Sequence, residues 1–242
     1  MAKGSGSRGR GGAPRRVGGA KPVAAGRSRT PKPKPKSERP VPLPPEEPRE
    51  FVLGAIPGAT PGKWIGLWRE RMPHVALELR AIAVSDQLDA LDQVDAALIR
   101  LPAEVSDDVH VIPLYEEEPV VVMSTDSPLT VADELEIADL RGEVVIAAAD
   151  AVLHLSIPDA VPPTFAAPAD AAEAIATVAA GVGVVIVPMS LARAHQRRDV
   201  EYRILRDGPR SVVALAWLRD RTTPDVETFV GIVRGRTARS SR

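Results

Sequence analysis

Residues 51–64, with the sequence FVLGAIPGATPGKW, combine a short apolar strand with a helix start that carries no acidic side chain. Thr60 is of a type that caps helices, and Pro61 suits the first helical turn because proline has no N–H to leave unpaired. The free N–H groups of a helix start and the positive end of its dipole attract anions. With Gly58 and Lys63 nearby, this segment is predicted to bind a small carboxylate without catalysing a reaction.

Residue types that support catalysis or metal binding are not arranged for it. The chain has no cysteine, and no serine lies in a nucleophile elbow. Residues 58–64 resemble a phosphate-binding loop, but they have three spacer residues in place of four and Trp64 where a hydroxyl must reach magnesium. The histidines have no paired metal-ligand spacing; they are His74, His110, His154 and His195. The sequence therefore predicts no enzyme, no metal ion and no cofactor.

The net charge of −1 conceals two oppositely charged parts. Residues 1–50 hold 13 Lys and Arg against 4 Asp and Glu, whereas the remaining residues hold 18 against 28. This asymmetry is typical of a basic tail attached to an acidic globular part. No secretory signal and no apolar run of about 20 residues is present. We therefore expect a cytoplasmic protein without a membrane segment.

The tail, residues 1–50, contains 10 Pro, 8 Gly and no aromatic residue. Such a composition cannot bury enough apolar surface to offset its ordering entropy, so the tail is predicted to be disordered. Its cations can bind nucleic acid non-specifically. The residues expected to do so are Arg8, Arg10, Arg15, Arg16, Lys32, Lys34 and Lys36. A solvated tether without a ligand is the alternative.

From residue 51 onward, short apolar strands alternate with amphipathic helices, which predicts an α/β fold with largely parallel sheets. The expected strands are residues 51–56, 75–79, 95–100, 109–114, 119–123, 143–147, 184–187 and 211–218. The expected helices are residues 61–72, 85–93, 169–181, 190–197 and 224–234, with a short one within 130–140. Residues 150–168 are left unassigned. The acidic residues 116–118 are expected in a solvated turn between strands, a cation site being the alternative.

Five segments in this order resemble the effector-binding domain of LysR-type transcriptional regulators, which has the type 2 periplasmic-binding-protein fold. They are LGAIPG (53–58), WRERMPHVALEL (68–79), LDAL with VDAALIR (88–100), VIPLYEEEPVVVM (111–123) and IATVAAGVGVVIVPMS (175–190). The resemblance implies two α/β lobes with a small-molecule cleft between them. Lobe one is expected at 51–100 and 188–236, lobe two at 103–186, and a flexible end at 237–242. The crossovers between lobes are expected near 99–102 and 187–189.

The resemblance also implies which residues contact the effector. Pro57, Gly58 and Thr60 follow the first strand, and Ser85 is expected to open the second helix, where relatives hold a carboxylate with a hydroxyl. Arg100 can pair with a carboxylate, an ion pair within the protein being the alternative. Asp170 is expected to cap the helix across the cleft. Ala169 beside it and Pro188 at the second crossover complete the expected set.

Residues 1–50 show no helical apolar periodicity, so the winged helix-turn-helix of these regulators is not expected in this chain. The sequence thus favours a non-catalytic effector-binding domain for a small organic acid, which relatives arrange as a homodimer. The alternative is a module that binds nucleic acid or protein through its basic tail.

Overall fold

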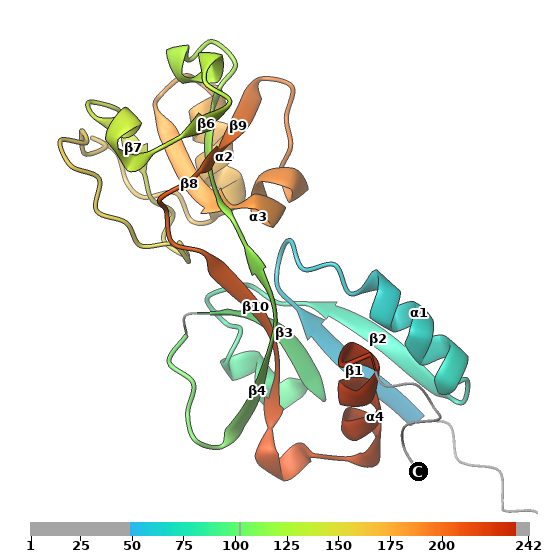
Figure 1. Ribbon diagram of the computed structural model, residues 1–242. Coiled ribbons are helices and arrows are strands. Elements are labelled where there is room, and N and C mark those ends of the chain that lie inside the picture. The colour runs from blue at the N-terminus through green and yellow to red at the C-terminus, as the bar shows by residue number, and fades with distance from the viewer. Residues whose placement is uncertain (1–48, 102, 236–242) are drawn as a thin grey trace, which may run out of the picture. The chain divides into compact units, whose positions relative to one another are not determined.

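The computed structural model describes residues 49–101 and 103–235. Residues 1–48 of the predicted tail and the predicted end at 237–242 lie outside the described residues. Arg49 and Glu50 were also expected in the disordered tail, but they begin the first strand. Within the described part, two five-stranded sheets form, and each carries its own helices (Figure 1). We call the sheet that begins with the first strand, together with its helices, the first lobe, and the other sheet with its helices the second lobe.

The first sheet has the strand order β2-β1-β3-β10-β4. β1 pairs in parallel with both β2 and β3, whereas β10 pairs antiparallel with β3 and with β4. The strands are β1 (Arg49–Ala55), β2 (Val75–Ala81), β3 (Ala96–Leu101), β4 (Val109–Glu117) and β10 (Ser211–Leu218). The central strand β3 is buried along almost its whole length, as expected for its apolar sequence.

The second sheet has the strand order β6-β9-β5-β8-β7. Its centre is antiparallel, since β5 pairs with β8 and β9 in that sense, and the two short outer strands add in parallel. The strands are β5 (Pro119–Ser124), β6 (Glu134–Leu135), β7 (Val145–Ile146), β8 (Val184–Pro188) and β9 (Val200–Leu205). Both sheets are therefore mixed, and the expectation of largely parallel sheets was wrong.

Four α-helices cover the described sheets. α1 (Gly62–Arg71) and α4 (Pro224–Val233) belong to the first lobe, and α2 (Ala171–Ala179) and α3 (Met189–Ala194) to the second. Short 3₁₀ helices occupy Asp89–Gln93, Pro128–Val131, Ile137–Leu140 and Arg219–Arg221. The expected helix at 85–93 is thus only a turn followed by a 3₁₀ helix. The expected short helix within 130–140 is replaced by two 3₁₀ helices on either side of β6.

The chain passes between the lobes twice, directly from β4 into β5 and from β9 into β10 (Figure 1). The expected lobe boundaries were wrong at both places. β4 pairs with β10 from Val109 to Glu117, so residues 109–117 lie in the first lobe. Because β9 pairs with β5, and α3 buries Leu191 against the second sheet, both elements belong to the second lobe.

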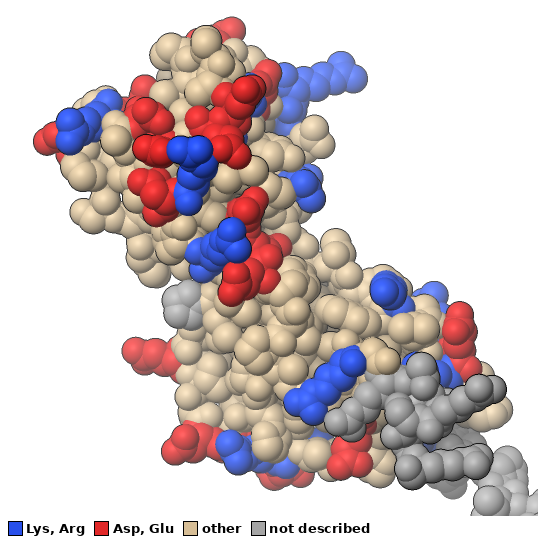
Figure 2. Space-filling model, viewed as in Figure 1, with Lys and Arg blue, Asp and Glu red and all other residues tan. Residues whose placement is uncertain are grey.

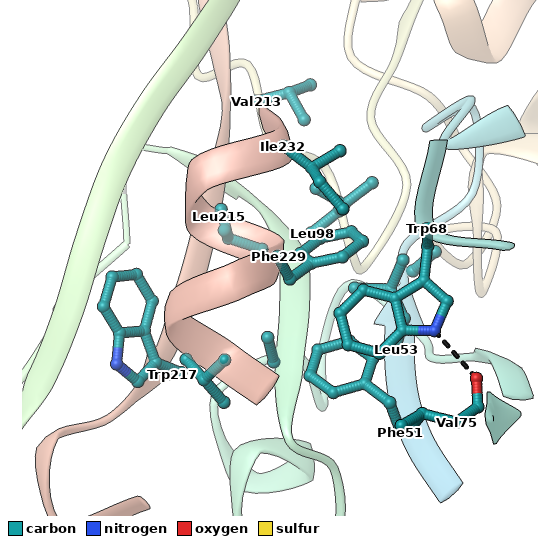
Figure 3. Packing of buried hydrophobic residues seen from close by; sticks show 13 residues of the cluster. Phe51, Leu53, Trp68, Val75, Leu98, Val213, Leu215, Trp217, Phe229 and Ile232 are labelled. Carbon is teal, nitrogen blue, oxygen red and sulfur yellow. Dashed lines mark hydrogen bonds between the residues drawn. The ribbon is translucent and has the colours of Figure 1, made fainter. Parts of the chain in front are cut away.

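The first-lobe core is organised around three aromatic rings. Phe51 stacks on Trp68 with 4.6 Å between ring centroids, and Phe229 of α4 lies 5.2 Å from Phe51 (Figure 3). Trp68 is fully buried, and its Nε1 donates to the carbonyl of Val75 at 3.0 Å. Trp64 and Leu67 of α1 pack against the same core.

Trp68→Ala is expected to lower the free energy of unfolding by about 3–5 kcal/mol, because a fully buried aromatic side chain is lost and a cavity remains. Urea denaturation checks this expectation. Trp64→Ala on the same helix is the control and should cost clearly less, since Trp64 is only partly buried. Equal losses for the two variants would contradict the central place of Trp68.

Candidate functional site

The loop after β1 leads into a helix start that no side chain caps. α1 begins at Gly62 with Pro61 in the N-cap position, and no acidic residue lies in its first turn. The expectation that Thr60 caps this helix was wrong, because the helix begins one residue later and Thr60 lies outside the capping position. The Thr60 side chain is exposed beside a helix start that still offers N–H groups to a ligand.

Gly58 of this loop brings the two lobes into contact. Its φ of +81° is a conformation that favours glycine. A Cβ at this position would lie 2.5 Å from the Oγ of Ser190, which is in α3 of the second lobe. The absence of a side chain at residue 58 therefore allows the first-lobe loop to approach the start of α3.

Arg100 is fully buried where the lobes meet, and its guanidinium is the centre of a hydrogen-bond network. Its Nη2 and Nε donate to one oxygen of Glu117, at 2.8 and 3.2 Å. Nη2 also donates to Ser190 Oγ at 2.9 Å, and Nη1 reaches the carbonyl of Pro57 at 3.4 Å. Of the two alternatives that the sequence left open for Arg100, the structure contains the ion pair within the protein.

Gln87 fixes the main chain at Arg100. The amide N–H of Arg100 donates to Gln87 Oε1 at 2.7 Å, and Gln87 Nε2 donates to the carbonyl of Arg100 at 3.1 Å. Gln87 is itself buried, so both ends of its amide are used in this contact. Gln87 was not among the residues expected from the sequence, because it lies 13 positions before Arg100 in a segment expected to be helical.

The acidic residues 116–118 comprise the end of β4 and the single residue that links it to β5, so the expectation of a turn here was wrong. Alternate side chains of an extended chain point to opposite sides. Glu117 accordingly points inward to Arg100, whereas Glu116 and Glu118 each lie 3.3 Å from Arg210, next to the other crossover. The three carboxylates are thus held by two arginines on opposite sides of the chain.

Ser85 lies in a turn, and its expected role as a helix cap was wrong. Its hydroxyl donates to Asp86 Oδ1 at 2.8 Å, and the following 3₁₀ helix has Leu88 in the N-cap position. No helix begins at Ser85, so its hydroxyl has no helix start to cap. Contact between Ser85 and an effector stays a prediction.

The start of α2 is occupied by the protein's own carboxylates. Asp170 is the N-cap, as predicted, and accepts from the Glu173 N–H at 2.9 Å. The Ala169 N–H donates to Glu173 Oε2 at 2.6 Å. Pro188 is buried where β8 ends and α3 begins. An effector role for Ala169 and Pro188 stays a prediction.

A cavity of about 560 Å³ lies beside this network and is lined by residues of both lobes. Gly58 and Thr60 are the predicted residues that line it. The other lining residues are Tyr115, Glu116, Glu117, Glu118, Met189, Ser190, Arg193 and Ala194. Most of them belong to the segments 111–123 and 175–190 or follow shortly after, and none of these eight was among the expected effector contacts.

Two titratable groups near the lobe junction have shifted pKa values. Burial, and then the charge of Glu117, raise the pKa of Tyr115, whereas the charge of Arg100 acts in the opposite direction. Burial also raises the pKa of Asp150, and the carboxylate of Asp170 raises it further, although Arg100 and His195 act in the opposite direction. Asp150 is therefore held in an environment that disfavours its charge.

Several charged side chains of the second lobe and the crossovers form ion pairs with their neighbours. Figure 2 shows acidic and basic side chains next to one another over the second lobe and the crossovers. Arg206, for example, contacts both Glu134 and Glu136. Within residues 49–101 and 103–235, no group of three or more metal-binding side chains is found. No helix of this part is long and apolar enough to span a bilayer.

Two α/β lobes that are joined by two crossovers and share a cavity define a two-lobed ligand-binding domain. The family model described as the LysR substrate binding domain matches residues 46–238. The chain therefore belongs to the LysR substrate-binding domain family, as predicted, and its relatives are transcription regulators.

Individual relatives agree with this assignment. The Hca operon transcriptional activator HcaR of Escherichia coli K12 is 26% identical over 208 residues, which cover 80% of this chain and 70% of that protein. The reduced OxyR regulatory domain of Pseudomonas aeruginosa matches 77% of this chain and 98% of its own, with a TM-score of 0.59 and 22% identity. The effector binding domain of a BenM variant matches 78% and 97%, with a TM-score of 0.62 and 19% identity.

Glu117→Gln is expected to lower the free energy of unfolding by about 3 kcal/mol, because it leaves the buried guanidinium of Arg100 without a counter-charge. Chemical denaturation measures the loss. Arg210→Gln is the control, since Arg210 is 57% exposed and its ion pairs should contribute about 1 kcal/mol or less. A loss for Arg210→Gln as large as that for Glu117→Gln would contradict this ranking.

Asp150→Asn is expected to stabilise the protein at neutral pH. A carboxyl pKa raised in the folded state means that stability falls as pH rises from the ordinary value of 3.8 through the folded pKa. The advantage of the Asn variant should therefore grow across that interval and then stay constant, as measured by melting temperature against pH. Asp199→Asn should instead lower the stability at neutral pH, because the hydrogen bond from Arg197 lowers the pKa of Asp199 in the folded protein.

Proposed function

We propose that this domain is a non-catalytic, cytoplasmic sensor that binds a small organic acid in the cavity between its lobes. The observation that carries the proposal is the cavity of about 560 Å³, because its lining combines Gly58 and Thr60 of one lobe with Ser190 and Arg193 of the other. Clefts between lobes are common ligand sites, and a ligand bound there changes the free energy of lobe closure directly.

The chemistry of the lining favours an anionic effector. The uncapped start of α1 lies beside Thr60, and Arg193 supplies an exposed guanidinium from α3. Tyr115 and Ser190 add hydroxyl groups that can donate hydrogen bonds. The carboxylates of Glu116, Glu117 and Glu118 oppose an anion less than their number suggests, because Arg100 and Arg210 pair with them.

Met189 and Ala194 supply apolar surface in the same cavity. A ligand that carries one carboxylate and a compact apolar part fits this combination of lining residues. Binding across the lobes would change the angle between them, and that change would pass to a partner or, through the basic tail, to nucleic acid. The pairing into a homodimer follows from the family resemblance and is part of the proposal.

The basic tail supports a second candidate function, binding of nucleic acid or of an acidic protein surface. The specific observation is its charge, 13 Lys and Arg against 4 Asp and Glu in residues 1–50. Its seven predicted contact residues, from Arg8 to Lys36, lie outside the described residues. The two functions are compatible, because a tail can anchor the protein while the cavity binds its effector.

A thermal-shift screen of the full chain against small carboxylic acids tests the proposal. A ligand present at 100 times its dissociation constant should stabilise the protein by about 2.7 kcal/mol, which raises the melting temperature measurably. Arg193→Gln and Thr60→Val should each weaken the effect of a stabilising acid. Arg198→Gln, an exposed charge change in the same lobe outside the cavity lining, should leave it unchanged.

Stabilisation by amines but by no acid of a broad panel would contradict the anionic effector. Stabilisation that neither Arg193→Gln nor Thr60→Val weakens would contradict the assignment of this cavity.

A further inference from the structure

Arg100 connects the lobes through a single side chain of the second lobe. Its Nη2 donates both to Glu117 of the first lobe and to Ser190 Oγ of α3, at 2.8 and 2.9 Å. Glu117 receives a further hydrogen bond from Ser211 Oγ at 3.4 Å, where β10 begins. The guanidinium is thus fixed on the first-lobe side before it reaches across to Ser190.

Ser190 is also the point that the first-lobe loop approaches. The Cβ position of Gly58 lies 2.5 Å from Ser190 Oγ and 3.0 Å from Ser190 Cβ. The start of α3 is held from a third side, because the Met189 N–H donates to the carbonyl of Glu118 at 3.0 Å. Arg100 and Gly58 thus approach Ser190, and the carbonyl of Glu118 binds the neighbouring Met189.

The cavity gives this contact a direct route to the ligand. Gly58, Glu117 and Ser190 all line it, so an occupant of the cavity touches the groups that join the lobes. A ligand oxygen placed there can accept from the Ser190 hydroxyl, whose oxygen already accepts from the buried Arg100. Hydrogen bonds from a charged donor are among the stronger ones, so a ligand that moves Ser190 relative to Arg100 changes an interaction large enough to shift an equilibrium between lobe arrangements.

We propose that Ser190 is a latch residue: its hydrogen bond from Arg100 holds the second lobe against the first in the ligand-free protein, and a ligand in the cavity acts on the lobe angle through it. The claim that a ligand acts on the lobe angle through Ser190 rests on the proposed function. The claim that the hydrogen bond holds the lobes together does not, because that hydrogen bond exists without any ligand.

Distance measurements between spin labels on the two lobes test the latch in the full-length, ligand-free protein. The chain has no cysteine, so Glu70→Cys on α1 and Ala176→Cys on α2 provide two exposed labelling sites without background. In this background, Ser190→Ala should raise the ratio of longer to shorter inter-lobe distances by about tenfold, equivalent to about 1.4 kcal/mol.

Ser156→Ala is the matched control, since Ser156 lines a different cavity with residues of the second lobe alone. It should give the distances of the labelled parent protein. Gly58→Ala is a second variant, because its added Cβ would displace Ser190 Oγ, and it should also populate the longer distances.

Unchanged distance distributions for both Ser190→Ala and Gly58→Ala would overturn the latch. So would a lower melting temperature of Ser190→Ala with parental distances, since that result assigns Ser190 a role in stability alone. Neither result depends on an effector. A failed acid screen combined with a distance shift in Ser190→Ala would instead overturn the proposed ligand and leave the latch supported.

Discussion

The ion pair between Arg100 and Glu117 is the interaction on which the arrangement at the lobe junction depends. A buried guanidinium is costly to desolvate, so every group around it must supply a partner. Glu117 supplies the charge, and Pro57 and Ser190 supply further oxygen atoms. The loop after β1, the first crossover and the start of α3 are thereby required to meet at one point.

The same requirement explains why the cavity lies where it does. Glu117 can reach Arg100 only because the chain remains extended as it leaves β4, which carries the acidic crossover past the start of α3. The surfaces beside that crossover cannot close fully, because Gly58 and Ser190 already touch on one side. A space lined by both lobes is left, with polar groups from each directed into it.

Much of the fold could be predicted from the sequence, because apolar runs bounded by Pro and Gly set most strands and helices. The family and its two lobes followed from the order of five segments. β9 was missed although Val200, Tyr202 and Ile204 alternate with charged residues, a pattern typical of a half-buried strand. The antiparallel pairings, and with them the lobe boundaries, depend on β10 and β9, whose partners lie far away in the sequence.

The site was less predictable, because its side chains come from segments that local patterns do not connect. Gly58 and Thr60 were chosen for their place after the first strand, and both line the cavity. Ser190, 90 residues from Arg100, carries no local signal that it accepts a hydrogen bond from that arginine. Ser85 was expected to cap a helix because its type suits that role, but residues 85–88 form a turn and the following 3₁₀ helix has Leu88 in the N-cap position.

The placement of Arg210 outside the crossovers has a consequence for how the two connections respond to dissolved salt. Its pairs with Glu116 and Glu118 are open to water, where mobile ions weaken attraction, whereas the pair between Arg100 and Glu117 is shielded from them. Rising ionic strength therefore weakens the ion pairs of Arg210 and leaves the pair between Arg100 and Glu117 intact. In concentrated electrolyte, the first crossover is therefore held mainly by its buried ion pair, through Glu117.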